Sequence, residues 1–135
     1  MFTKRLKHYC KFEIVQLELP TKLKSSDSET IKKNEGELLL KKITPTDFII
    51  LLDEKGKEYS SVEFANFISK KSVHESSLTF VIGGAYGFSN EVYERANAKL
   101  SLSKMTFSHQ LIRLIFAEQL YRAFTIIKGE PYHHE

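Results

Sequence analysis

Residues 78–87 read Leu-Thr-Phe-Val-Ile-Gly-Gly-Ala-Tyr-Gly, and this stretch decides the class of fold that we expect. The continuous run from Leu78 to Ile82 is typical of a strand buried on both faces of a parallel sheet. The strand meets Gly83 and Gly84 directly, and such residues let a backbone turn sharply and approach a ligand closely. In an open α/β sheet, ligands bind at the carboxyl ends of the strands. Residues 82–89 are therefore a candidate binding loop, with a plain strand-to-helix turn as the alternative.

Strands and helices alternate on both sides of this loop. Apolar or β-branched runs predict further strands over residues 12–19, 48–53 and 100–105. Capping boxes and helical apolar stripes predict helices over residues 26–40, 60–68, 90–98 and 109–125, and a basic helix that ends over residues 5–11. Gly56 is expected to mark a turn. The pattern predicts an α/β fold with a mostly parallel sheet and helices on both faces.

Length and composition predict one domain over residues 1–135. The chain is 41% hydrophobic and 27% charged, which argues against a disordered chain. Cys10 is the single cysteine and no secretory segment is seen, which points to the cytoplasm. The longest apolar run, residues 48–52, is too short for a membrane span of about 20 residues. We therefore expect a cytoplasmic protein without a membrane partner.

The positive charge gathers towards the two ends of the chain. Net charge is +4 for residues 1–42, −3 for residues 43–98 and +2 for residues 99–135. A fold that joins the two ends would form a surface attractive to phosphate, whereas ordinary solvated faces are the alternative.

Two further segments carry candidate chemistry. Residues 102–110 read Leu-Ser-Lys-Met-Thr-Phe-Ser-His-Gln, and their hydroxyl groups could cap a helix or bond to a ligand. The tail, residues 129–135, reads Gly-Glu-Pro-Tyr-His-His-Glu and is either a frayed terminus or a nucleotide contact. Its two histidines have no cysteine or histidine cluster beside them, so no metal site is predicted. Without a Gly-x-Ser-x-Gly elbow, a nucleophilic hydrolase is disfavoured.

Several motifs together resemble those of one bacterial family. They are Ile82-Gly83-Gly84-x-x-Gly87, Leu100 to Phe107, His109-Gln110 with Arg113, Glu118 to Ala123, and Gly129 to His133. In order and spacing they are similar to the ribosomal RNA large subunit methyltransferase H family of the SPOUT, or trefoil-knot, methyltransferases. The resemblance implies a deep trefoil knot over approximately residues 78–135, an exception to the rule that chains avoid knots. It also implies a homodimer. Family members usually begin with a further strand, which this chain is expected to lack.

The resemblance also implies a cofactor, a substrate and a cofactor site. The family methylates N3 of a pseudouridine in 23S ribosomal RNA on the assembled ribosome, with S-adenosylmethionine as the methyl donor. The residues that match the family's cofactor site are Leu52, Gly83, Leu102, Ser103, Lys104, Met105, Thr106 and Phe107.

The reaction chemistry suggests further roles beside these motifs. Methyl transfer from a sulfonium is a direct displacement, so it needs alignment and a dry pocket rather than a metal. The imide N3 must lose a proton, and our hypothesis is that His109 or His133 assists this step. Arg113 and Arg122 would then hold phosphate or the developing oxyanion. The expected RNA contacts are Arg122, Tyr132, His133 and His134. For Arg122 a dimer or core salt bridge is the alternative, and for Tyr121 we expect packing.

Two other functions remain open at this point. One is a non-catalytic ribosome- or RNA-binding module that retains the knotted fold. The other is a small-molecule methyltransferase, which the basic ends and the tail disfavour.

Overall fold

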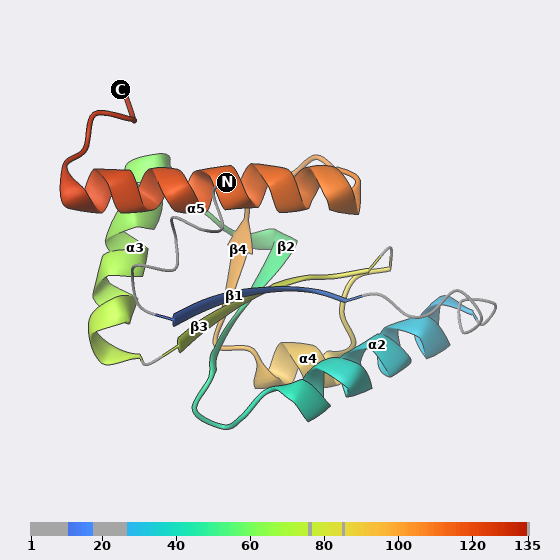
Figure 1. Cartoon of the computed structure of the whole chain (residues 1–135). Coiled ribbons are helices and arrows are strands. Elements are labelled where there is room, and N and C mark those ends of the chain that lie inside the picture. The colour runs from blue at the N-terminus through green and yellow to red at the C-terminus, as the bar shows by residue number, and fades with distance from the viewer. Residues whose placement is uncertain (1–10, 18–26, 76, 85, 135) are drawn as a thin grey trace.

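The computed structural model describes residues 11–17, 27–75, 77–84 and 86–134. In this part of the chain, four strands form one sheet in the order β1-β3-β2-β4, and every pairing between them is parallel (Figure 1). The strands are β1 (Lys11–Gln16), β2 (Phe48–Glu58), β3 (Ser77–Ile82) and β4 (Ala98–Ser101). The helices are α2 (Ser28–Lys42), α3 (Ser61–His74), α4 (Asn90–Arg95) and α5 (His109–Lys128). The prediction of a parallel α/β sheet is confirmed.

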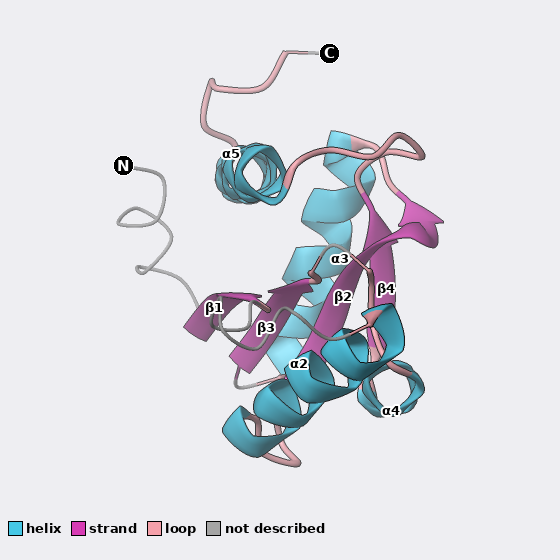
Figure 2. Cartoon of the chain, turned by 90° about the vertical axis from the view of Figure 1, so that its right-hand side faces the viewer, coloured by secondary structure: helices cyan, strands magenta, loops and turns pink. Residues whose placement is uncertain are grey.

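Helices cover both faces of the sheet, as the sequence predicted (Figure 2). Successive strand residues point to opposite faces, so β2 sends Ile50 towards α3 and α5 and its neighbours Ile49 and Leu51 towards α2 and α4. Strand β3 does the same with Phe80 and Val81. All six residues of β3 are buried, which explains its continuous apolar run. None of the helices in the described ranges is long and apolar enough to cross a membrane.

Phe116 lies at the centre of the layer formed by α3 and α5. Its side chain is fully buried, with its ring centroid 4.7 Å from that of Phe80 and 6.0 Å from that of Phe64. Phe116→Ala is expected to lower the free energy of unfolding by about 3–5 kcal/mol, because it removes a buried ring and leaves a cavity. Urea denaturation measures this loss. Gln110→Ala, at an exposed position of the same helix, should change stability by less than about 0.5 kcal/mol, and equal losses would contradict the packing.

The predicted turn at Gly56 is wrong. Strand β2 continues through Gly56 to Glu58, and its pairing with β4 shifts so that both Leu52 and Lys57 face Leu100. A Cβ atom on Gly56 would lie only 2.8 Å from the backbone nitrogen of Leu100 and 2.8 Å from the carbonyl carbon of Lys99. The glycine therefore allows two backbones to approach at an irregularity within the strand.

The predicted strand over residues 100–105 is displaced. Strand β4 covers only Ala98–Ser101, and residues 102–108 form a loop. The hydroxyl of Ser101 donates to the carbonyl of Ser103 at 3.1 Å, and the hydroxyl of Ser103 accepts from the backbone N–H of Met105 at 3.0 Å. Such local bonds compete with the ladder of a sheet, so the segment leaves the strand.

The helix boundaries match the predictions in part. The capping box of Ser60 and Glu63 is confirmed, with both of its hydrogen bonds present. Ser26, the predicted cap, lies outside the described residues, and α2 is capped by Asp27, which accepts from the N–H of Thr30 at 2.9 Å. Helix α4 ends early, at Arg95, and α5 extends to Lys128.

Some predictions fall outside the described residues. These are Cys10, residues 5–10 of the predicted first helix, residues 18–19 of the first predicted strand, and Ser26. Lys11, which was placed at the end of that helix, instead begins β1.

Candidate functional site

A pocket of about 380 Å³ opens beside residues 52–55 in the middle of β2 and at the carboxyl ends of β3 and β4. Its volume lies within the range of about 300–1,000 Å³ that is usual for small-molecule sites. Of the eight residues expected to bind a cofactor, it brings seven together: Leu52, Gly83, Leu102, Ser103, Met105, Thr106 and Phe107. Lys104 does not line it; its ammonium lies 3.8 Å from the carboxylate of exposed Glu58. Part of β2 and two loops, which are far apart in sequence, therefore form one site.

The glycines after β3 shape one wall of this pocket. The N–H of Gly87 donates to the carbonyl of Gly84 at 3.2 Å, and Gly87 has a φ of 85°, which side chains rarely allow. A Cβ on Gly83 would lie 3.0 Å from the ring of Phe88, and a Cβ on Gly84 would overlap the carboxylate of Glu35. The segment is a sharp turn and also lines the pocket, so both interpretations of residues 82–89 describe it.

The loop after β4 forms the opposite wall. Ser108 accepts from the N–H of Leu111 at 3.3 Å and caps α5, as the helix-cap interpretation predicted. The hydroxyl of Thr106 donates to Glu54 at 3.4 Å, which joins this loop to the part of β2 that follows Leu52. The hydrogen bonds of Ser101 and Ser103 hold the rest of this wall in place.

The pair of Asp53 and Tyr93 is a part of the site that sequence reasoning missed. Both side chains line the pocket, and the hydroxyl of Tyr93 donates to Asp53. The backbone N–H of Lys55 donates to the other oxygen of Asp53 at 3.0 Å, so the carboxylate is fixed from two sides. A fixed negative group suits a ligand that carries positive charge. The acid at the end of the apolar run 48–52 was the available signal, whereas its partner lies 40 residues away.

Burial, together with the hydrogen bond and charge of Asp53, raises the pKa of Tyr93 to about 12. A raised pKa favours the protonated phenol in the folded state, so this contribution to stability is complete below pH 10 and is lost as the pH rises towards 12. Tyr93→Phe should therefore lose less stability than the wild type between pH 10 and 12 in alkaline denaturation. Tyr86→Phe, at a half-exposed tyrosine, serves as the control and should follow the wild type. Identical alkaline profiles for wild type and Tyr93→Phe would contradict the assignment.

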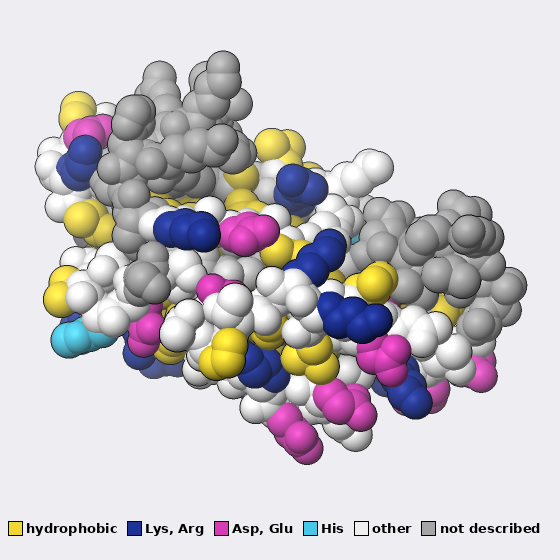
Figure 3. Space-filling model, turned by 60° about the horizontal axis from the view of Figure 1, so that its bottom comes forward, with side chains coloured by type: hydrophobic (Ala, Val, Ile, Leu, Met, Phe, Trp, Pro, Cys, Tyr) yellow, Lys and Arg dark blue, Asp and Glu magenta, His cyan; other side chains and the backbone are white. Residues whose placement is uncertain are grey.

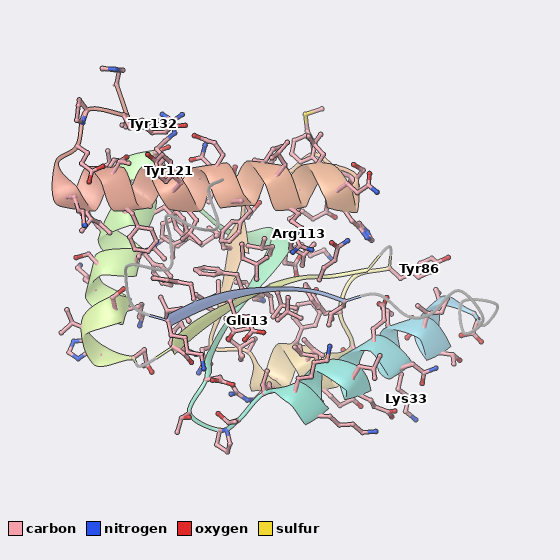
Figure 4. All side chains as sticks on the ribbon, in the orientation of Figure 1. Glu13, Lys33, Tyr86, Arg113, Tyr121 and Tyr132 are labelled. Carbon is pink, nitrogen blue, oxygen red and sulfur yellow. The ribbon has the colours of Figure 1, made fainter. Side chains whose placement is uncertain are left out.

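The predicted catalytic residues do not meet in one chain. His109 lines the pocket, and exposed Arg113 follows one turn later. His133 contacts Arg122, which lies 13 residues and about 20 Å along α5 from His109. Figure 4 shows Tyr121 and Tyr132 over one end of this helix and Arg113 beneath its other half.

The tail folds back onto α5 around Glu118. One carboxylate oxygen of Glu118 accepts from Arg122 at 2.9 and 3.2 Å and from the hydroxyl of Tyr132 at 3.0 Å. The guanidinium of Arg122 lies 5.0 Å from the centroid of the Tyr132 ring, and its remaining nitrogen, Nη1, lies 3.0 Å from Nδ1 of His133. The interpretation of the tail as frayed is therefore wrong for Tyr132 and His133, and Arg122 forms the alternative salt bridge within its own chain.

Tyr121 and His134 lie beside this cluster. Tyr121 packs against the core and has its ring edge against Tyr132, with centroids 4.9 Å apart, which confirms the expected packing. His134 is exposed beside this cluster.

Charge is mixed on the face formed by α2 and α4. Figure 3 shows Lys and Arg side chains there interspersed with Asp and Glu. Lys32, for example, lies 2.9 Å from the carboxylate of Glu29. This face fits the interpretation of ordinary solvated charge. Among the described residues, no group of three or more His, Cys, Asp or Glu side chains could hold a metal ion.

Comparison with known proteins gives consistent matches along the whole chain. Residues 1–133 match the family described as "Predicted SPOUT methyltransferase". The chain is 54% identical over 135 residues to the ribosomal RNA large subunit methyltransferase H of Christiangramia forsetii and 53% identical over 135 residues to that of Flavobacterium psychrophilum, covering 99% of this chain and 86% of each relative. It is 52% identical over 136 residues to the protein of the same name from Carboxydothermus hydrogenoformans, covering 98% of this chain and 86% of that relative.

Proposed function

The chain belongs to the SPOUT methyltransferase family, and from this membership we propose that it methylates N3 of a pseudouridine in 23S ribosomal RNA on the assembled ribosome, with S-adenosylmethionine as methyl donor. The observation that carries the proposal is the pocket beside the middle of β2 and at the ends of β3 and β4, where seven of the eight expected cofactor residues lie together. The proposal includes a knotted region over approximately residues 78–135 within one domain of residues 1–135.

The residues of the pocket fit this cofactor. Apolar walls from Leu52, Leu102 and Phe107 suit an adenosine group, and the fixed carboxylate of Asp53 suits a cation. S-Adenosylmethionine supplies an electrophilic methyl group on a positively charged sulfur. The segments that line the pocket would hold the donor and exclude water, which is most of what a direct displacement needs.

In this proposal, His109 and Arg113 would act on the substrate's side of the reaction. His109 lines the pocket, so its imidazole is within the site where the proton of N3 must be accepted. Arg113 is exposed one helical turn later, where a guanidinium can bind an anionic oxygen of the RNA.

The distance between pocket and tail supports a homodimer. The tail contacts Glu118 and Arg122, about 13 and 20 Å along α5 from His109 at the pocket, and none of its described residues lines the pocket of its own chain, so it would serve the pocket of a second copy. The outer face of α5 also exposes Leu111 and Leu114, at 43% and 60%, and Met105 on the preceding loop is 74% exposed. Apolar side chains on a surface next to a site favour an interface, and a two-fold dimer would pair the same surface of both copies.

Transfer of labelled methyl groups from S-adenosylmethionine tests the proposal. We expect label in the RNA of intact ribosomes, and much less in free ribosomal RNA. Cofactor binding without transfer would contradict the proposal and support the non-catalytic RNA-binding module. Transfer to small molecules in place of ribosomes would support the small-molecule methyltransferase. We expect this reaction in the cytoplasm, where ribosomes are found.

A further inference from the structure

The ring of His133 is held by an arginine, and this contact restricts what the histidine can do. Nη1 of Arg122 lies 3.0 Å from Nδ1 of His133. A guanidinium has five N–H donors and no acceptor, so in this contact Nδ1 of His133 is the acceptor. A neutral imidazole has one proton, and when Nδ1 accepts, that proton is on Nε2.

Glu118 holds the arginine in this orientation. Two N–H groups of Arg122, on Nε and Nη2, point to the same oxygen of Glu118, which leaves Nη1 directed at His133. The stacked ring of Tyr132 and its hydroxyl bond to Glu118 restrict the arginine further. Arg122 and Glu118 are only about one quarter exposed, so water screens their interaction less than it would at an open surface. The tautomer of His133 is therefore set by the contacts among Glu118, Arg122 and Tyr132.

We propose that His133 acts as a hydrogen-bond donor, through Nε2, to an oxygen of the RNA substrate, and that Glu118 and Arg122 are the positioning residues that set this role. The inference rests on the proposed function and deepens it, because a ring that presents Nε2–H cannot take the proton of N3 through that nitrogen. The proton has to be accepted elsewhere, and His109 in the pocket is placed for it. The acceptor for Nε2–H is an anionic oxygen, either of a phosphate or of the reacting base.

Nitrogen NMR of the full chain tests the tautomer without any turnover. Imidazole ¹⁵N shifts distinguish a protonated from an unprotonated ring nitrogen. For His133 at neutral pH we expect a protonated Nε2 and an unprotonated Nδ1. A protonated Nδ1 in the neutral ring would overturn the proposal. This result stands whether or not the chain methylates RNA, so it separates a failure of this inference from a failure of the proposed function.

Amide replacements test the role in catalysis. The side-chain nitrogen of Gln can occupy the place of Nε2, whereas that of Asn reaches only the place of Nδ1. His133→Ala and His133→Asn should lower kcat/KM for ribosomes about 10-fold or more, and His133→Gln should stay within about 3-fold of the wild type. A loss in kcat would identify the oxygen as part of the reacting base, and a loss in KM would identify a phosphate.

A matched control comes from the same tail. Glu130→Gln changes an exposed side chain and should leave kcat/KM unchanged. If His133→Gln is as defective as His133→Ala, the histidine is needed as a base and the proposal is wrong. Full activity of His133→Ala would equally overturn it.

Discussion

Mixing two inactive variants of this chain is expected to restore about one quarter of wild-type methyl transfer. The first variant, Thr106→Trp, fills the pocket from its exposed rim. The second ends at Gly129 and therefore lacks Tyr132 and His133. Each alone should transfer methyl groups at less than about 1% of the wild-type rate, because one lacks a cofactor site and the other lacks the tail at the RNA.

The recovery follows from the length of α5. Because the tail contacts Arg122, about 20 Å along α5 from His109 at the pocket, a working site would combine the pocket of one copy with the tail of the other. Random pairing after joint refolding makes half of the dimers mixed, and each mixed dimer has one site with both parts intact. About one quarter of all sites are then active.

Cofactor binding provides the control for this experiment. The truncated variant should bind S-adenosylmethionine as tightly as the wild type, since none of the described residues that it lacks lines the pocket. Recovery in the mixture requires the tail to act across the dimer. If both variants are inactive and their mixture stays inactive after verified subunit exchange, the tail serves its own chain and the proposed dimer is wrong.

The second large effect is expected from Gly56→Ala, which should lower the free energy of unfolding by about 2–3 kcal/mol. The added Cβ would lie 2.8 Å from two backbone atoms of β4, in Leu100 and Lys99, and backbone cannot rotate away as a side chain can. Strands β2 and β4 would be forced apart. Because both strands lead directly into the pocket walls, affinity for S-adenosylmethionine should fall about 10-fold or more as well.

Gly129→Asn is the matched control for this substitution. Gly129 has a φ of 70° and nothing within 4 Å of an added Cβ, and asparagine is accepted at such helix ends. Chemical denaturation should give a change below about 1 kcal/mol for Gly129→Asn. A Gly56→Ala variant as stable as this control would mean that the two strands are not in close contact.

The fold could be predicted largely because its strongest signals are local. The run from Leu78 to Ile82 is continuous since β3 is buried on both faces, and this property can be read from the sequence. The capping box at Ser60 needs only a partner three residues later. Local patterns such as these define most element positions.

The errors arise where contacts between distant segments decide the structure. Gly56 looks like a turn residue, and only the approach of β4 shows that it permits a close contact within a strand. The residues after Ser101 have a composition compatible with a strand, but serine hydroxyls bond to the nearby backbone and end it.

In the candidate site, too, local patterns could be predicted and contacts between distant residues could not. Seven of the eight residues that the motifs grouped line the pocket, whereas the bond between Asp53 and Tyr93 joins positions 40 residues apart. Sequence reasoning also gave His109 and His133 similar roles. Helix geometry separates them, and the orientation of Arg122 distinguishes their chemistry.

Nucleoside analysis of the product tests the central claim most directly. Ribosomes would be incubated with this chain and S-adenosylmethionine, and the 23S RNA would be digested and examined by mass spectrometry. We expect one new methyl group, on N3 of a pseudouridine, that is missing without the cofactor and with Thr106→Trp. A methyl group on a different nucleoside, or unmodified RNA from a chain that binds the cofactor, would contradict the account.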